Sequence, residues 1–209
     1  MMNLFKKLAR FLKKRRLMKA APSILSLDAE TNGLWGQAFA IGAILYDGDG
    51  KEIARFIGRC PINGKVNEWV AENVLPQMKD VVVTHKTYPD LLRAFMAWRA
   101  VHRGGTTIEI VHVGVPVEAR LFQDAHQMSI IGDWDAPYPL VDIAAIPEIG
   151  LSVDSYNAVY GISPSPDEFS GGTHNPLYDS AAAAIAYRHW LKTPRLLRGF
   201  RMAKASWWR

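Results

Sequence analysis

Residues 23–45 read "SILSLDAETNGLWGQAFAIGAIL", two apolar segments separated by a short polar turn. The first segment ends in two acids, Asp28 and Glu30. Residues i and i+2 of a strand point to the same side, so both carboxylates would lie together at the carboxyl end of the strand. Two neighbouring anions repel each other, and the pair therefore requires a cation, a shared proton or full solvation. A solvated turn formed by "ETNG" is the simplest alternative.

The pattern around this stretch predicts a mixed α/β domain. Strands are expected at 23–29, 37–46 and 51–59, and tight turns such as "DGDG" would join them into an antiparallel meander. Two further strands are expected at 106–114 and 138–145, and a loop is expected at 163–172. Helices are expected at 67–75, 87–103, about 116–129, 153–161 and Pro176 to about Leu191. This order, β-β-β-α-α-β-α-β-α-α, predicts helices packed on a central sheet.

Length and composition favour one compact domain. The chain has 209 residues, of which 49% are hydrophobic, enough to bury a sizeable core. Its single cysteine, Cys60, cannot form an internal disulfide, which suits a reducing compartment. No run of 18 apolar residues is present, and the basic N-terminus lacks the continuous apolar segment of a secretory signal. We therefore expect a cytoplasmic protein.

Charge is distributed unevenly along the chain. The formal net charge is +5, but residues 1–20 hold eight Lys/Arg and no acids, and residues 188–209 hold seven and no acids. Residues 21–187 therefore keep all 20 acids against ten basic residues. Basic ends attract polyanions, whereas clustered acids in the body indicate metal ligands, although most surface acids only solvate the protein.

The N-terminal segment, residues 3–19, places apolar residues at helical spacing among lysines and arginines. This pattern predicts a basic amphipathic helix. Such a helix could bind an anionic membrane surface, nucleic acid or a protein partner. It could also be an extension upstream of a start at Met18. The sequence leaves these alternatives open.

A second chemical signal is "GGTHNPLYDSAAAA", residues 171–184. Asn175 suits a helix N-cap and Pro176 the first helical position, which puts Asp179 in the first turn. His174 lies in the loop just before, beside an acid, where it could move a proton at neutral pH. The simplest alternative is a surface histidine and an acid that suits the helix dipole.

These two stretches together resemble the DnaQ-like exonuclease superfamily. Asp28-x-Glu30 followed by "TNGL" is similar to its first motif, and His174, four residues, then Asp179 is similar to the third motif of its DEDDh branch. Their separation of about 145 residues and the order of elements also agree over residues 22–192. The resemblance implies a ribonuclease H-like α/β fold, in which helices flank a central mixed five-stranded sheet.

The second motif of the family departs from its usual form. The family has an Asn and then Phe-Asp at the start of the helix after the fourth strand, where this chain reads "VHVGVPVEARLFQD". We align Val117-Glu118 with Phe-Asp, so Glu118 is the predicted acid. Asp124 is the other candidate, but it lies about 9 Å further along the helix and on another face. Asp142 matches a position that is usually not catalytic.

The resemblance implies a metal-dependent nuclease. Asp28, Glu30, Glu118 and Asp179 would hold two divalent cations, Mg²⁺ or Mn²⁺, which favour all-oxygen ligation. His174 would act as the general base for the attacking water. The implied reaction is hydrolysis of phosphodiesters from the 3′ end of single-stranded DNA or RNA, releasing nucleoside 5′-monophosphates.

The resemblance also implies a substrate contact just after the first motif. Thr31 and Leu34 would hold the terminal nucleotide, and the neighbouring Trp35 could stack on a base. Core packing or a chance surface position is the alternative for Trp35. The implied domains are residues 1–20 as a basic N-terminal helix or extension, 21–192 as the exonuclease domain, and 193–209 as a basic, Trp-containing tail.

Two other functions remain open at this point. Glu118 and the missing Asn favour an inactive DnaQ-like module that binds nucleic acid or protein, and turnover with divalent metal would separate the two classes. A phosphodiesterase acting on short or cyclic oligonucleotides would use the same motifs. DNA and RNA differ at the 2′-hydroxyl, which no motif here reports. The oligomeric state, for which a homodimer is one candidate, is equally open.

Overall fold

The computed structural model describes residues 21–194, so the predicted helix at 1–20 and most of the tail at 193–209 lie outside the described residues. Within this range no helix combines the length and apolarity needed to cross a membrane. The strands are β1 (Ile24–Thr31), β2 (Ala38–Tyr46), β3 (Glu52–Arg59), β4 (Ile108–Val111) and β5 (Leu140–Asp142). The helices are α2 (Glu68–Asn73), α3 (Tyr88–His102), α4 (Val117–Gln127), α5 (Val153–Tyr160), α6 (Pro166–Phe169) and α7 (Pro176–Lys192), with 3₁₀ helices η1 (Leu75–Met78) and η2 (Ile143–Ala145).

The five strands form one mixed sheet in the order β3-β2-β1-β4-β5. β1, β2 and β3 pair antiparallel, which confirms the predicted meander. β4 and β5 run parallel to β1. The carboxyl ends of β1, β4 and β5 therefore lie at the same end of the sheet, where the loops that follow these strands come together.

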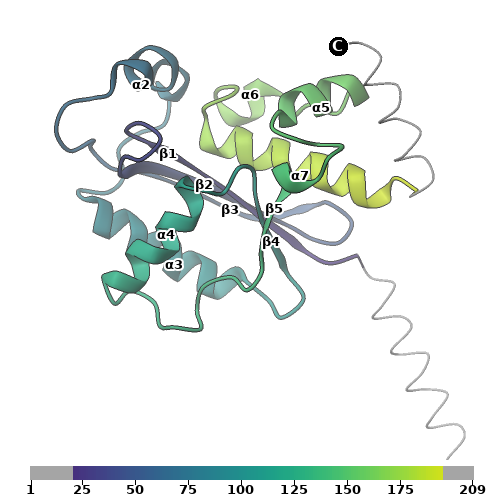
Figure 1. The fold of residues 1–209 in the computed structure, drawn as a ribbon, viewed down its shortest axis with the longest axis horizontal. Coiled ribbons are helices and arrows are strands. Elements are labelled where there is room, and N and C mark those ends of the chain that lie inside the picture. Colours follow the sequence, from purple (N-terminus) through teal and green to yellow (C-terminus); the bar gives the residue numbers. More distant parts are fainter. Residues whose placement is uncertain (1–20, 195–209) are drawn as a thin grey trace, which may run out of the picture.

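Helices cover both faces of the sheet (Figure 1). Ile24 of β1 packs with residues of α5, α6 and α7, whereas the next residue, Leu25, packs with residues of α3 and α4. This alternation follows from the two-residue repeat of a strand. Together with the mixed five-stranded sheet it confirms the predicted ribonuclease H-like α/β fold.

Helix α7 lies unusually close to the sheet. A Cβ added to Gly42 of β2 would stand 2.4 Å from the carbonyl carbon of Pro176, so only glycine fits there. Ser180 donates a hydrogen bond from Oγ to the Gly42 carbonyl oxygen at 3.0 Å. The buried alanines at 181–184 continue this close approach, as the sequence predicts. The first turn of α7 is therefore fixed against the centre of the sheet.

Three local details differ from the prediction. The strand expected at 138–145 spans only Leu140–Asp142, and the next three residues form the 3₁₀ helix η2, which the Asp142 side chain caps. The loop at 163–172 contains the short helix α6, because Pro166 stands in its first turn and Asp167 and Glu168 suit its positive end. The helix expected at 67–75 ends at Asn73, and the 3₁₀ helix η1 follows. Pro76 lacks the backbone N–H that would continue the α-helical ladder.

Candidate metal centre and active site

Strand β1 brings the two acids of the first motif to one face. Asp28 and Glu30 follow Ile24 at even spacing, so they point to the face that α7 covers. Both lie near the carboxyl end of β1, where β2 pairs with it through Gly42 and Ala40. The close approach of α7 at Gly42 therefore sets the distance between β1 and the start of α7.

The start of α7 places His174 and Asp179. The Asn175 side chain accepts a hydrogen bond from the Leu177 N–H, and Pro176 occupies the first turn, as the sequence predicts. His174 has a left-handed backbone with φ 71°, and its N–H donates to Asp179 Oδ2 at 2.8 Å. This contact ties the loop to the first turn of the helix.

Three side chains from these two elements converge. Glu30, His174 and Asp179 each offer one ligand atom, and these atoms lie within 4.8 Å of one another. The Nδ1 atom of His174 is 3.9 Å from Glu30 Oε1. A carboxylate from β1, a carboxylate from α7 and an imidazole at this separation form a candidate metal centre.

Glu118 reaches the same strand from the other face. It stands in the first turn of α4, is only 3% exposed, and accepts a hydrogen bond through Oε1 from the Ala29 N–H at 3.1 Å. Ala29 lies between Asp28 and Glu30, so the side chain reaches the acids of the first motif. The second oxygen, Oε2, is buried without a hydrogen-bond partner among the described residues.

The two other acids considered for the second motif have structural partners. Asp124 accepts a hydrogen bond from the Tyr88 hydroxyl at 2.7 Å and lies 3.6 Å from Arg120 Nε. Asp142 accepts hydrogen bonds from the backbone N–H groups of Val113, Gly114 and Ala144 and thereby orders the ends of β4 and β5. Of the three acids, Glu118 alone carries a buried oxygen without a partner.

No lysine or arginine among the described residues balances the negative charge of the four predicted metal ligands. Burial raises the pKa of Asp28 to about 7. Burial, and after it repulsion by Asp28, raises the pKa of Glu30, Glu118 and Asp179 well above their usual values. None of the four forms an ion pair with a lysine or arginine within residues 21–194. Four oxygen donors without a counter-charge fit a site for divalent cations.

His174 has the surroundings of a neutral imidazole. Partial burial lowers its pKa, and the negative charge of Asp154 opposes the shift only in part. Its ring meets the indole of Trp69 edge to face, with ring centroids 5.2 Å apart. Sequence reasoning gave no role to Trp69, because nothing in a short amphipathic helix indicates which distant loop it contacts.

The predicted substrate residues lie at the end of β1 and in the loop that follows it. Leu34 is 63% and Trp35 72% exposed, which excludes core packing for Trp35. Their loop is nevertheless held in place, because Arg120 donates a hydrogen bond to the Trp35 carbonyl oxygen at 2.7 Å. Asn32 fixes the other side of the loop through hydrogen bonds with Lys65 and Asn67. Thr31, the last residue of β1, is partly buried.

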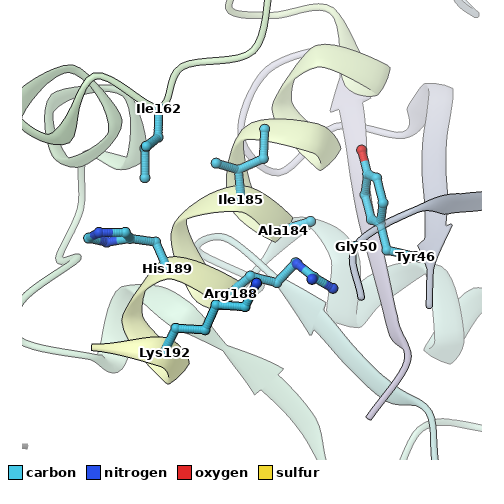
Figure 2. A pocket seen from close by; sticks show the side chains of 8 residues that line it. All are labelled: Tyr46, Gly50, Ile162, Ala184, Ile185, Arg188, His189 and Lys192. Atoms are coloured by element: carbon cyan, nitrogen blue, oxygen red, sulfur yellow. The ribbon is translucent and has the colours of Figure 1, made fainter. Parts of the chain in front are cut away.

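The other titratable features lie apart from this cluster. The five remaining histidines bond to other groups: His85 to Thr84, His102 to Trp98, His112 to Gly150, His126 to Asp133 and His189 to Tyr156. A cavity of about 240 Å³ lies beside the C-terminal half of α7 and is lined by Arg188 and Lys192 (Figure 2). Asp179 and Arg188 are nine residues apart, about 13 Å along the helix, so this cavity is separate from the acidic cluster.

Comparisons with known proteins identify solved structures that have a similar fold. No protein-family model matches the sequence, and no curated protein matches it. Among solved structures, the nuclease domain of 3′hExo, a DEDDh family member bound to rAMP, matches with a TM-score of 0.55 and 15% sequence identity. That match covers 83% of this chain and 94% of the other.

A second match is E. coli Exonuclease I in complex with a dT13 oligonucleotide, with a TM-score of 0.54 and 16% identity. It covers 87% of this chain but only 43% of Exonuclease I, so the chain spans less than half of that enzyme. The chain thus has the fold of the DnaQ-like 3′–5′ exonucleases, and the predicted resemblance is confirmed for the fold. At this identity the likeness does not extend to activity or substrate.

Proposed function

We propose that the chain is a metal-dependent 3′–5′ exonuclease that hydrolyses single-stranded DNA or RNA to nucleoside 5′-monophosphates. The observation that carries the proposal is the convergence of Glu30, His174 and Asp179, whose ligand atoms lie within 4.8 Å of one another. We assign Asp28 of β1 and Glu118 of α4 to the same cluster, because burial and, after it, the negative charge of Asp28 raise the pKa of Glu30, Glu118 and Asp179. The nuclease fold of the structural neighbours supports the same chemistry.

In this proposal Asp28, Glu30, Glu118 and Asp179 hold two Mg²⁺ or Mn²⁺ ions. The raised pKa values of these acids support the assignment, because a bound cation would stabilise the ionised carboxylates that burial disfavours. The unpartnered Oε2 of Glu118 is available for such a contact. Divalent cations held by these residues would activate a water and offset the negative charge that develops on the leaving 3′ oxygen.

His174 is assigned as the general base. Partial burial lowers its pKa, so the ring is neutral at pH 7 and able to accept the proton of the attacking water. The Nδ1 atom of the ring lies 3.9 Å from Glu30 Oε1, beside the acidic cluster. Its backbone N–H bond to Asp179 fixes the loop that carries the ring.

Leu34, Trp35 and Thr31 are assigned to the terminal nucleotide. Leu34 and Trp35 are exposed on a loop whose backbone is held by Arg120 and Asn32, so their side chains can meet a base without rearrangement of the loop. Stacking on an aromatic ring contributes about 1–3 kcal/mol per base and tolerates any sequence. This tolerance suits an enzyme that removes successive nucleotides.

The test is digestion of a 5′-labelled single-stranded oligonucleotide, as DNA and as RNA, with Mg²⁺ or Mn²⁺. We expect a ladder of products shortened from the 3′ end, no products in EDTA, and no products from the Asp28→Ala variant. A circular single strand of the same sequence has no 3′ end and should resist cleavage. Cleavage of the circle, or cleavage in EDTA, would contradict the proposal, and binding without cleavage would indicate a binding module.

A further inference from the structure

The segment formed by α2 and η1 contacts the loop that carries His174 at two points. Trp69 of α2 meets the His174 ring at 5.2 Å between centroids, with the planes at 88°. Further along the segment, the carbonyl oxygen of Gln77 lies so close to Gly171 that an added Cβ would stand 2.7 Å from it. The segment therefore supports the His174 loop through both a ring contact and a backbone contact.

The same segment is anchored to the loop that follows β1. The Asn67 N–H donates a hydrogen bond to Asn32 Oδ1 at 2.8 Å, and Asn32 Nδ2 donates to the Lys65 carbonyl oxygen at 3.0 Å. Asn67 also caps α2 by accepting a hydrogen bond from the Val70 N–H. Trp69 is thus carried by a helix that is fixed at its N-cap, Asn67, to the loop that follows β1.

The imidazole of His174 has few other restraints. Its Nδ1 atom is 3.9 Å from Glu30, beyond hydrogen-bond distance, and no group within residues 21–194 forms a hydrogen bond with the ring. The side chain is about one-third exposed. Rotation about its two side-chain torsions could therefore carry the ring away from the acidic cluster, unless a packing contact prevents it.

We propose that Trp69 is a positioning residue, which holds the His174 imidazole beside the carboxylates in the orientation that the reaction uses. This inference rests on the proposed function, in which His174 accepts a proton. Edge-to-face aromatic contacts have a defined geometry and are attractive beyond their buried area. Because Trp69 acts through His174, its removal should slow the chemical step and leave binding of the nucleic acid nearly unchanged.

The exposure of Trp69 makes this idea testable without unfolding the protein. Its side chain is 55% exposed, and the buried residue of α2 is Val70. The N-cap of the helix is Asn67, which a change at Trp69 does not touch. Trp69→Ala should therefore keep the fold. Trp69→Phe should keep an aromatic edge or face for the histidine.

The experiment is a double-mutant cycle with His174→Ala, read as the single-turnover rate of cleavage of a 5′-labelled single-stranded oligonucleotide with Mn²⁺. Trp69→Ala should lower this rate about tenfold and change the oligonucleotide Kd less than about twofold. Trp69→Phe should restore most of the rate. In the His174→Ala background, Trp69→Ala should have almost no further effect, because the ring that it positions is gone.

The matched control is Trp134→Ala. Trp134 is also exposed and also makes an edge contact, with Tyr138. It precedes β5, and because β5 runs parallel to β1, the start of β5 lies at the other end of the sheet from Glu30. This variant should cleave at the parental rate. An equal loss from Trp69→Ala with and without His174 would make Trp69 a direct substrate contact and overturn the proposal, as would a parental rate in Trp69→Ala.

A second measurement does not depend on cleavage. The indole ring current should shift the imidazole proton signals of His174, which are identified in the NMR spectrum by their loss in His174→Ala. In Trp69→Ala these signals should move towards the position of an exposed histidine. Unchanged signals would overturn the positioning role, even if the protein cleaves no oligonucleotide. Shifted signals without any cleavage would instead contradict the proposed function alone.

Discussion

Asp28→Asn should make the metal-free protein more stable while it abolishes cleavage. Burial raises the pKa of Asp28 to about 7, from its usual 3.8. After burial, the negative charge of Asp28 is also the largest cause of the raised pKa values of Glu30, Glu118 and Asp179. An asparagine has the same shape without the charge, so it removes the penalty of a buried anion and part of the repulsion in the cluster.

The size and the sign of the expected change in the free energy of unfolding follow from the raised pKa of Asp28. Below pH 3.8 the carboxyl is protonated in both the folded and the unfolded chain, and the penalty is absent. Between that pH and about 7 only the unfolded chain releases the proton, so the free energy of unfolding falls by about 1.4 kcal/mol per pH unit. Above pH 7 the accumulated loss is at most about 4 kcal/mol. Asp28→Asn should recover much of this at pH 8 and little at pH 4.

The assay is thermal or urea unfolding in EDTA at pH 4 and pH 8. A gain of 1 kcal/mol raises the Tm of a domain of this size by about 2–4 °C. Millimolar Mg²⁺ should narrow the difference between the two proteins at pH 8, because it stabilises the folded parent more than the variant. The matched control is Asp124→Asn, whose partners are Tyr88 and Arg120, and which should be neutral or slightly destabilising. An equal gain at both pH values, or no gain at pH 8, would refute the reasoning.

Two further variants test the second motif and the approach of α7. Glu118→Ala should abolish cleavage with the fold intact, whereas Asp124→Ala should keep cleaving; the opposite result in the digestion assay would show that the alignment of the second motif is wrong. Gly42→Ala should lower the free energy of unfolding by about 1–3 kcal/mol and impair cleavage, because its Cβ would push the start of α7 away from β1. Gly105→Ala, where the new Cβ meets open space, should leave both unfolding and cleavage unchanged.

Local sequence signals predicted the elements and both ends of the candidate site. Strand β1, with Asp28 and Glu30 on one face, follows from a two-residue repeat, and the start of α7 follows from Asn175 and Pro176. Each of these signals acts within a few residues. The resemblance then supplied the long-range information that no single segment contains, namely that the two ends meet.

The remaining features depend on contacts between distant segments. The sequence does not reveal that Trp69 meets His174, or that Asn32 joins the loop after β1 to the segment before α2. These contacts depend on how the connection from β3 to α3 packs against the loop after β1 and the loop before α7. Helix α6 does not follow from the sequence for a different reason, because a four-residue helix in a Ser/Pro/Gly-rich segment has too few residues to show a period.

The departure at the second motif has a physical explanation in the geometry of Glu118. One oxygen accepts a hydrogen bond from the Ala29 N–H, and the other is buried without a partner. A glutamate is one methylene longer than an aspartate, so from the first turn of α4 it can contact the β1 backbone and still direct its second oxygen towards the acids of that strand. In the proposed function the same arrangement would make the site depend on a cation, since burial of Glu118 beside Asp28 without a counter-charge disfavours ionisation of both. A glutamate at this position is therefore compatible with the proposed metal ligand. Because Oε1 is occupied by the Ala29 N–H, Oε2 is the oxygen that would be available to an ion.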